Sequence, residues 1–154
     1  MIKFRAWDKK TKEYFHIYEL WNSGTNPECF NFDGWTDNFG NKGRLKDIVI
    51  EQFTGLKDVN GKEIYIGDII QYSDHFYGYS MGGVTELETE YIGVVVKNNF
   101  DLGILINRIS NTDAHINHYN AKEFVPFCEF EDPEADVLLK GNVHANPELL
   151  EEDE

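Results

Sequence analysis

The chain has 154 residues, of which 28 are Asp or Glu and 14 are Lys or Arg, so its formal net charge is −14. This length is that of one domain or two small ones, and a hydrophobic content of 41% excludes a disordered chain in spite of the charge. No apolar run approaches the ~18 residues of a membrane-spanning helix, and residues 1–7 alternate apolar and charged side chains, so we expect neither a membrane span nor a signal peptide.

The N-terminal part of the chain has a hydrophobic period of two, which is typical of strands. Residues 2–7 alternate, residues 8–12 are polar, and residues 13–18 resume the alternation. This pattern predicts a β-hairpin over residues 2–18.

Residues 19–45 are rich in Gly and Asn and predict a long loop. A long loop inside a compact domain is uncommon and usually serves function or an interface. We expect its aromatic side chains to pack within the molecule, with burial on a partner as the alternative. These side chains are Trp21, Phe30, Phe32, Trp35 and Phe39.

The middle of the chain predicts a strand over residues 47–53 and a tight hairpin turn at Asn60-Gly61, because both residue types tolerate positive φ. Strands over residues 64–66 and 68–72 follow. Gly67 between them predicts a bend of the kind that curls a sheet. Residues 73–90 predict a loop rich in Gly and Tyr.

The C-terminal part of the chain predicts four further elements. Residues 91–97 and 102–107 form a hairpin, residues 124–130 form a strand that Pro126 places at a sheet edge, and another strand lies around residues 141–143. Residues 146–150 begin with Asn and Pro and predict a short helix. The fold class is therefore mainly β (a β-rich α+β fold), built as small curved sheets or barrel-like subdomains with one short C-terminal helix.

The charge is concentrated in the second half of the chain. Residues 1–65 carry ten basic and ten acidic side chains, whereas residues 66–154 carry four basic and eighteen acidic ones. Such a balance repels phosphate backbones and anionic membranes, so we expect no direct nucleic-acid partner and no membrane partner. The acidic residues cluster at Glu129, Glu131, Asp132, Glu134 and Asp136, and at Glu148, Glu151, Glu152, Asp153 and Glu154.

We interpret residues 151–154 as a solubilising acidic tail. The alternative is that the acidic half mimics nucleic acid and occupies the basic site of a DNA-binding enzyme. The two cysteines, Cys29 and Cys128, are too few for a secreted disulfide framework and indicate the cytoplasm. We expect both to be small buried side chains, with a Cys29–Cys128 disulfide as the alternative.

Asp113, His115 and His118 are the metal-ligand candidates. Two histidines three apart converge on a helix, but the neighbouring residues show no helical stripe, and no cysteine or general-base Glu accompanies them. Phosphate-binding loops and nucleophile motifs are absent from the sequence. We therefore predict no catalytic, cofactor-binding or metal-binding residues and no cofactor, and keep a metal-dependent enzyme centred on these three residues as an alternative.

Three blocks of the sequence stand out as a set: residues 2–8 (IKFRAWD), residues 52–70 (QFTGLKDVNGKEIYIGDII) and residues 141–150 (GNVHANPELL). Together these blocks resemble the YopX family. They occur in the family's order and span nearly the whole chain. The resemblance implies one YopX-like domain over residues 1–154, with two packed subdomains at about 1–53 and 54–150 as the alternative. It implies a protein encoded by a phage or prophage, and supplies no catalytic or ligand residues, because the family has no established biochemical role.

The leading functional hypothesis is a non-enzymatic accessory protein in the cytoplasm of a bacterial host that acts through protein–protein contacts. Its protein partner is unknown, and a homo-oligomer is one expected form. The interface candidates are residues 19–45 and residues 73–83, because exposed aromatic and Met side chains are typical of interfaces. In the second segment these side chains are Phe76, Tyr77, Tyr79 and Met81.

Overall fold

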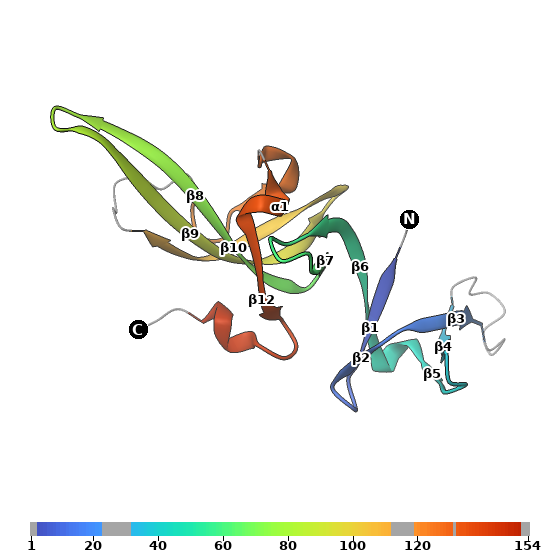
Figure 1. The fold of residues 1–154 in the computed structure, drawn as a ribbon. Coiled ribbons are helices and arrows are strands. Elements are labelled where there is room, and N and C mark those ends of the chain that lie inside the picture. The colour runs from blue at the N-terminus through green and yellow to red at the C-terminus, as the bar shows by residue number, and fades with distance from the viewer. Residues whose placement is uncertain (1–2, 23–31, 112–118, 131, 152–154) are drawn as a thin grey trace. The chain divides into compact units, whose positions relative to one another are not determined.

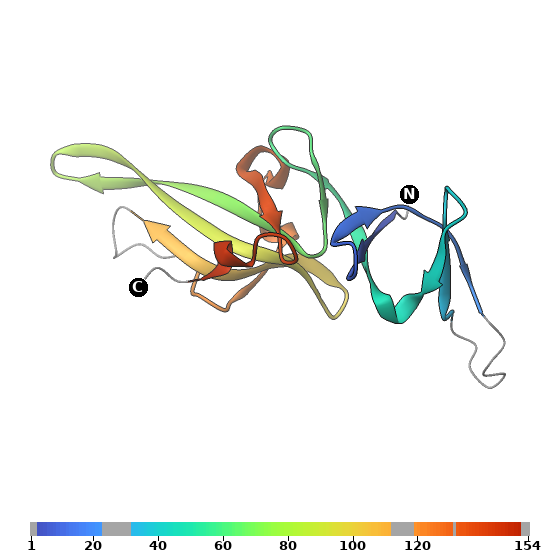
Figure 2. The same ribbon diagram turned by 90° about the horizontal axis from the view of Figure 1, so that it is seen from below.

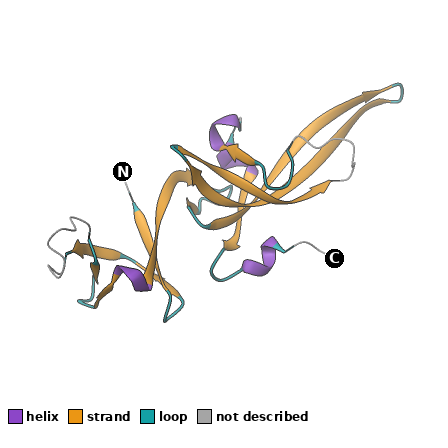
Figure 3. Ribbon diagram, turned by 180° about the vertical axis from the view of Figure 1, so that it is seen from behind, coloured by secondary structure: helices purple, strands orange, loops and turns teal. Residues whose placement is uncertain are grey.

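The computed structural model describes residues 3–22, 32–111, 119–130 and 132–151. It confirms a mainly β fold in which the helices are short segments (Figure 3). The strands are β1 (Phe4–Asp8), β2 (Glu13–Phe15), β3 (Ile17–Trp21), β4 (Gly34–Asp37), β5 (Lys42–Arg44), β6 (Ile48–Lys57), β7 (Glu63–Tyr65), β8 (Asp68–Ser80), β9 (Gly83–Asn98), β10 (Asp101–Asn111), β11 (Phe124–Pro126) and β12 (Val137–Asn142). The helices are η1 (Leu45–Asp47), η2 (Phe127–Glu129), α1 (Pro133–Asp136) and η3 (Pro147–Leu150).

The chain divides into two compact units, Met1–Phe53 and Thr54–Glu154. In the first unit β1 pairs antiparallel with β2 and with β6, and β4 pairs antiparallel with β3 and β5. The predicted hairpin at residues 2–18 is confirmed for β1 and β2, although Ile17 and Tyr18 belong to the next sheet. A small core of Ala6, Trp35 and Ile48 holds this unit together.

The predicted loop over residues 19–45 is wrong for the described residues of that segment, which form β3, β4, β5 and η1. Its glycines misled the prediction, because Gly34 and Gly43 lie within strands. A Cβ atom at Gly34 would overlap the Trp21 ring, and one at Gly43 would overlap the Trp35 ring. The glycines therefore make room for tryptophans, as expected where backbone and a large ring approach closely.

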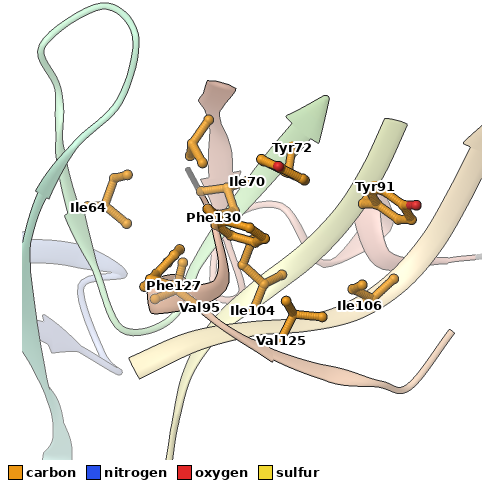
Figure 4. Close-up of a cluster of buried hydrophobic side chains, with 11 residues drawn as sticks. Ile64, Ile70, Tyr72, Tyr91, Val95, Ile104, Ile106, Val125, Phe127 and Phe130 are labelled. Carbon is orange, nitrogen blue, oxygen red and sulfur yellow. The ribbon is translucent and has the colours of Figure 1, made fainter. Parts of the chain in front are cut away.

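The second unit is built on an antiparallel sheet with strand order β11-β10-β9-β8-β12, which curls around its own core (Figure 1). Figure 4 shows the side chains of that core, where Tyr72 stacks on Phe130 with ring centroids 4.1 Å apart. The buried members are Ile64, Ile70, Tyr72, Tyr91, Val95, Ile104, Ile106, Val125, Phe127, Phe130 and Val137.

Three irregularities bend this sheet. Gly67 has a φ of 95° between β7 and β8, which confirms the predicted bend. Register shifts lie between Ile106 and Arg108 in β10 and between Leu139 and Gly141 in β12. Bulges of this kind increase local twist, and they account for the curl.

The predicted loop over residues 73–90 is wrong, because β8 and β9 continue through it as one long hairpin. Pairing runs from Ile69 opposite Val94 to Ser80 opposite Gly83 without a register shift. The turn is only Met81-Gly82, and Gly83 takes a φ of 118°. The glycines thus mark a tight two-residue connection, and the end of the hairpin extends beyond the other described strands of this unit (Figures 1 and 2).

The remaining C-terminal predictions are partly confirmed. The hairpin of β9 and β10 forms as predicted, and β11 with Pro126 is an edge strand, but the chain turns into η2 before residue 130. Cys128 lies in that turn and is exposed and free, so the prediction that it is buried is wrong. Cys29 lies outside the described residues. Among the described residues, no helix is long and apolar enough to cross a membrane.

The short C-terminal helix is confirmed as η3, a single 3₁₀ segment. Asn146 precedes it without a side-chain cap. Its Oδ1 instead accepts a hydrogen bond from the backbone N–H of Asn142, at 3.3 Å. Asn146, predicted as the N-cap of this helix, therefore closes the turn that follows β12.

Asp58 is a buried carboxylate in the turn between β6 and β7, with 3% of its surface exposed. Its Oδ1 accepts hydrogen bonds from the backbone N–H groups of Asn60 and Lys62, both at 2.9 Å. Its Oδ2 accepts one from Leu139 in β12, at 3.0 Å. The predicted hairpin turn is confirmed, with Gly61 at a φ of 81°, and this carboxylate joins it to the far edge of the sheet.

The pKa of Asp58 lies below its ordinary value of 3.8. Burial raises this pKa, but the three backbone N–H donors and the positive charge of Lys62 together lower it by more. Donors that hydrogen-bond to the ionised form favour that form. The stability that the carboxylate contributes is therefore present above pH 3.8 and is lost as the pH falls through the lower pKa of the folded state.

We expect Asp58→Asn to lower the free energy of unfolding at pH 7 by about 2–3 kcal/mol, because an amide cannot accept all three hydrogen bonds. The difference from the wild type should shrink below about pH 4, where the wild-type carboxyl also becomes protonated. Urea unfolding followed by tryptophan fluorescence at both pH values measures this. Asp101→Asn, at the exposed first residue of β10, is the matched control and should stay within ~0.5 kcal/mol. If Asp58→Asn were as stable as Asp101→Asn, the proposed stabilising role of the Asp58 carboxylate would be contradicted.

Candidate protein-interaction surface

The turn between β4 and β5 presents the exposed side chain of Phe39 on a rigid backbone. Asp37 Oδ1 accepts hydrogen bonds from the N–H groups of Phe39 and Asn41, both at 2.9 Å. Its Oδ2 accepts one from Asn41 Nδ2 at 2.8 Å. Gly40, with a φ of 86°, completes the turn. The backbone under Phe39 is therefore ordered before any partner arrives.

The pKa of the Asp37 carboxyl lies below its ordinary value of 3.8. The side-chain hydrogen bond from Asn41 is the largest cause, partial desolvation opposes it, and backbone N–H groups of the turn add to the lowering. The carboxylate is thus held in its charged, hydrogen-bonded form at neutral pH.

Two shallow hollows flank this turn and share Asp37 and Asn38 as a common wall. The hollow on the β3 side has a volume of about 370 Å³ and the other about 240 Å³. The first is lined by Tyr18, Glu19, Thr36, Asp37, Asn38 and Gly40. The second is lined by Tyr14, Phe15, His16, Asp37, Asn38 and Phe39.

Tyr18 and Phe39 are the exposed aromatic residues of these hollows. Tyr18 lies at a register shift in β3 and is 74% exposed, and Phe39 is 90% exposed. We name Tyr18, Asn38, Phe39 and the two hollows the Phe39 surface. An exposed aromatic pair beside a hollow, on a backbone that is already ordered, has the composition of an interface centre.

Tyr14, at the base of the second hollow, is fixed by other groups. Its hydroxyl donates to Glu51 Oε1 at 2.8 Å, and the Arg5 guanidinium lies 4.1 Å from its ring centroid. Arg5 Nε also donates to Glu51 at 3.0 Å. Glu51 is 4% exposed, so Tyr14 is held in this hollow by a partly buried hydrogen-bond network.

The structure separates the aromatic residues that the sequence treats alike. Trp35 is buried and Trp21 packs on Gly34, whereas Phe32 and Phe39 are exposed. Phe30 lies outside the described residues. Tyr18 lies one residue before the predicted segment of 19–45, and sequence reasoning missed it. The signal for the turn is Asp37 followed by Gly40 and Asn41, the same spacing as Asp58, Gly61 and Lys62.

The second predicted interface segment, residues 73–83, lies at the end of the β8–β9 hairpin. Met81 in its turn is fully exposed. The side chains of Phe76, Tyr77 and Tyr79 lie outside the description, although the backbone of these residues is part of β8. The backbone of this segment is therefore a projecting hairpin. The proposal that its aromatic side chains form an interface stays a prediction.

The metal-ligand candidates Asp113, His115 and His118 lie outside the described residues, so that hypothesis stays a prediction. Across residues 3–22, 32–111, 119–130 and 132–151, no three His, Cys, Asp or Glu side chains lie close enough to hold a metal ion. A further hollow of about 520 Å³ lies at the β10 bulge. Asn107 is one of the residues that line it, and its buried Oδ1 has no hydrogen-bond partner among the described residues, a need that a water or a ligand N–H would satisfy.

Two residues of the acidic cluster before β12 have structural roles. Asp132 caps α1 by accepting from the Ala135 N–H at 3.3 Å, and Glu134 accepts from the Lys57 N–H at 3.2 Å. Glu129 is exposed and Asp136 is partly buried. Glu131 and residues 152–154 lie outside the description. Part of this cluster is therefore explained by the fold itself.

Comparisons with known proteins find a matching family model and a solved structure of similar fold. A family model described as YopX protein matches residues 3–151. The crystal structure of protein EF1440 from Enterococcus faecalis is similar, with 23% sequence identity and a TM-score of 0.55 over 98% of this chain and 99% of that one. This likeness supports the fold alone. Comparison with curated proteins finds no match.

We expect the Asp37 carboxyl to titrate below pH 3.8, and Asn41→Ala to move its midpoint up toward that value, because the strongest donor is removed. Carbon-detected NMR of the carboxyl groups measures both midpoints. Lys42→Ala, next along the chain, is the control and leaves the Asn41 donor in place. An unchanged midpoint in Asn41→Ala would contradict the geometry of the turn.

Proposed function

The chain belongs to the YopX family, and from this premise we propose that it is a phage- or prophage-encoded accessory protein that acts through protein–protein contacts and not as an enzyme. The single observation that carries the proposal is Phe39, an aromatic side chain that is 90% exposed on a turn fixed by three hydrogen bonds to Asp37. A single exposed aromatic side chain is ordinary on a protein surface, and what distinguishes Phe39 is the ordered turn beneath it and the two hollows that flank that turn.

The energetics of the Phe39 surface suit recognition. Burying one exposed phenylalanine on a partner contributes about 1.5–3 kcal/mol. Binding normally loses part of this gain to ordering of loops and side chains. Here the turn is already ordered by Asp37 and Gly40, so little of the gain is lost. The hollows beside Tyr18 and Phe39 supply the recesses into which a partner's side chains would fit.

The partner is a protein, and a second copy of the chain is one form that the proposal allows. The proposed location is the cytoplasm of a bacterial host. It is supported by the use of only two cysteines, one of which, Cys128, is exposed and free. A free exposed thiol is typical of a reducing compartment.

Nucleic-acid mimicry is the second candidate function, and a specific observation favours it. The unit Thr54–Glu154 carries six basic and twenty acidic residues, whereas Met1–Phe53 carries eight of each. A field of one sign over one unit steers basic partners toward it. The partner would be a host or phage enzyme that binds DNA. A metal-dependent enzyme centred on Asp113, His115 and His118 remains a hypothesis of the sequence alone.

Replacing Tyr18 and Phe39 together by Ser should weaken capture of the partner from host lysate by at least about tenfold, because a truncated interface centre costs more than ~1.4 kcal/mol. Quantitative mass spectrometry measures the capture, and light scattering gives the oligomeric state. Phe100→Ser, which removes a phenylalanine that is 95% exposed in the β9–β10 turn, is the matched control and should change neither. The proposal fails if the Phe39 surface variant retains all partners and the wild-type oligomeric state.

The mimicry candidate predicts that capture of a basic protein falls as salt rises. Glu129→Gln together with Asp136→Asn should weaken it while leaving the fold intact, because these two acids have no hydrogen bond to α1 or β6 among those described. Fluorescence unfolding checks the fold. Capture that is equal in 50 mM and 500 mM salt would rule this candidate out.

A further inference from the structure

The β8–β9 hairpin continues past the strands that flank it. On one side, β12 pairs with β8 only as far as Val137 opposite Tyr72, and Val137 is the residue at which the chain enters β12 from α1. On the other side, β10 pairs with β9 from Asn98 only as far as Thr89. We name residues 73–88 the arm. Within the described chain, each strand of the arm has one paired edge and one open edge.

The open edge of β8 is long and free of bulges. It runs over residues 73–80, about 26 Å at ~3.3 Å per residue, which exceeds the length of a typical strand. Natural edges are usually blunted by proline, lysine or a bulge. Residues 73–80 contain neither proline nor lysine, and pairing with β9 shows no register shift there. Alternate N–H and C=O groups along this edge are therefore available to another strand.

The charges on and beside this edge have one sign. Residues 73–88 include Asp74, Glu86 and Glu88 and no Lys or Arg. The first residue of β12, Val137, lies opposite Tyr72 and follows α1 directly. The exposed Glu134 in α1 and Asp132 at its N-cap add two further negative charges. The arm and the element before β12 are therefore net negative, which favours a basic segment as the partner of this edge.

From this edge and these charges we infer that β8 binds an extended, basic segment of another protein as an added strand over residues 73–80. Backbone hydrogen bonds supply the pairing, and Lys or Arg side chains at alternate positions of the segment meet the carboxylates. A second arm is disfavoured as the occupant, since each arm carries three acidic residues and no Lys or Arg, and two arms of like net charge repel each other. The site is independent of the Phe39 surface.

The test uses the full chain and a synthetic peptide, acetyl-Thr-Lys-Val-Lys-Thr-Lys-Val-Lys-amide. NMR-detected hydrogen exchange should slow at alternate amides within residues 73–80 when the peptide is added in 50 mM salt. A version methylated at alternate backbone nitrogens keeps the charge and loses the hydrogen bonds, so it should bind at least about tenfold more weakly. A version with Glu in place of Lys should not bind.

A protein variant tests the charge separately. Glu86→Gln with Glu88→Gln should weaken binding at least about threefold in low salt. Asp101→Asn with Glu148→Gln removes the same charge elsewhere and should leave binding within about twofold. Equal binding of the methylated peptide, or protection confined to residues outside 73–80, would overturn the inference. Concentration-dependent protection of the arm without peptide would also overturn it, because the occupant would then be a second copy.

Discussion

The carboxylate of Asp58 joins two segments of the second unit, the β6–β7 turn and β12. It accepts from Asn60 and Lys62 in the β6–β7 turn and from Leu139 in β12, and it is buried while doing so. Val59 N–H adds a backbone bond to Val137 O at 2.9 Å. Since Val137 is opposite Tyr72 in β8, the turn determines where β12 begins its pairing. The open length of β8 beyond Tyr72 is thus a consequence of this one anchored turn.

The same turn occurs again in the first unit with a different outcome. In both turns the Asp Oδ1 accepts from the N–H groups two and four residues later, and a glycine three residues later has positive φ. The Asp N–H donates to the carbonyl four residues on, at 3.0 Å in Asp37 and 2.8 Å in Asp58. The second carboxylate oxygen, Oδ2, accepts a hydrogen bond from Leu139 of β12 in Asp58 but from the Asn41 side chain, within the same turn, in Asp37. The Asp58 turn therefore connects two parts of its unit, whereas the Asp37 turn is closed on itself and exposes Phe39 to solvent.

Sequence patterns predict the features that depend on neighbouring residues. The Asn60-Gly61 turn and the Gly67 bend follow from local backbone preferences, and both are present. The pairing of residues 73–90 was missed because Gly78, Gly82 and Gly83 suggest a loop, while the partner strand that orders them is the other half of the same hairpin. Trp35 and Phe39 lie four residues apart, yet one is buried over Gly43 and the other is exposed. That difference depends on non-local pairing of β4 with β5, which composition does not encode.

The two candidate surfaces rely on different physical forces, because the charge is divided between the units. Met1–Phe53 has no net charge, and the Phe39 surface exposes the aromatic side chains of Tyr18 and Phe39, so contact there gains from apolar burial, which simple salts do not screen. Thr54–Glu154 carries the whole net charge, so contact at the arm gains from attraction that salt weakens over about 8–10 Å at 0.1–0.15 M. A partner that engages the arm should therefore be released by salt, and a partner on the Phe39 surface should not. The division of charge near Phe53 thus gives one chain two candidate contact surfaces whose binding would respond differently to salt.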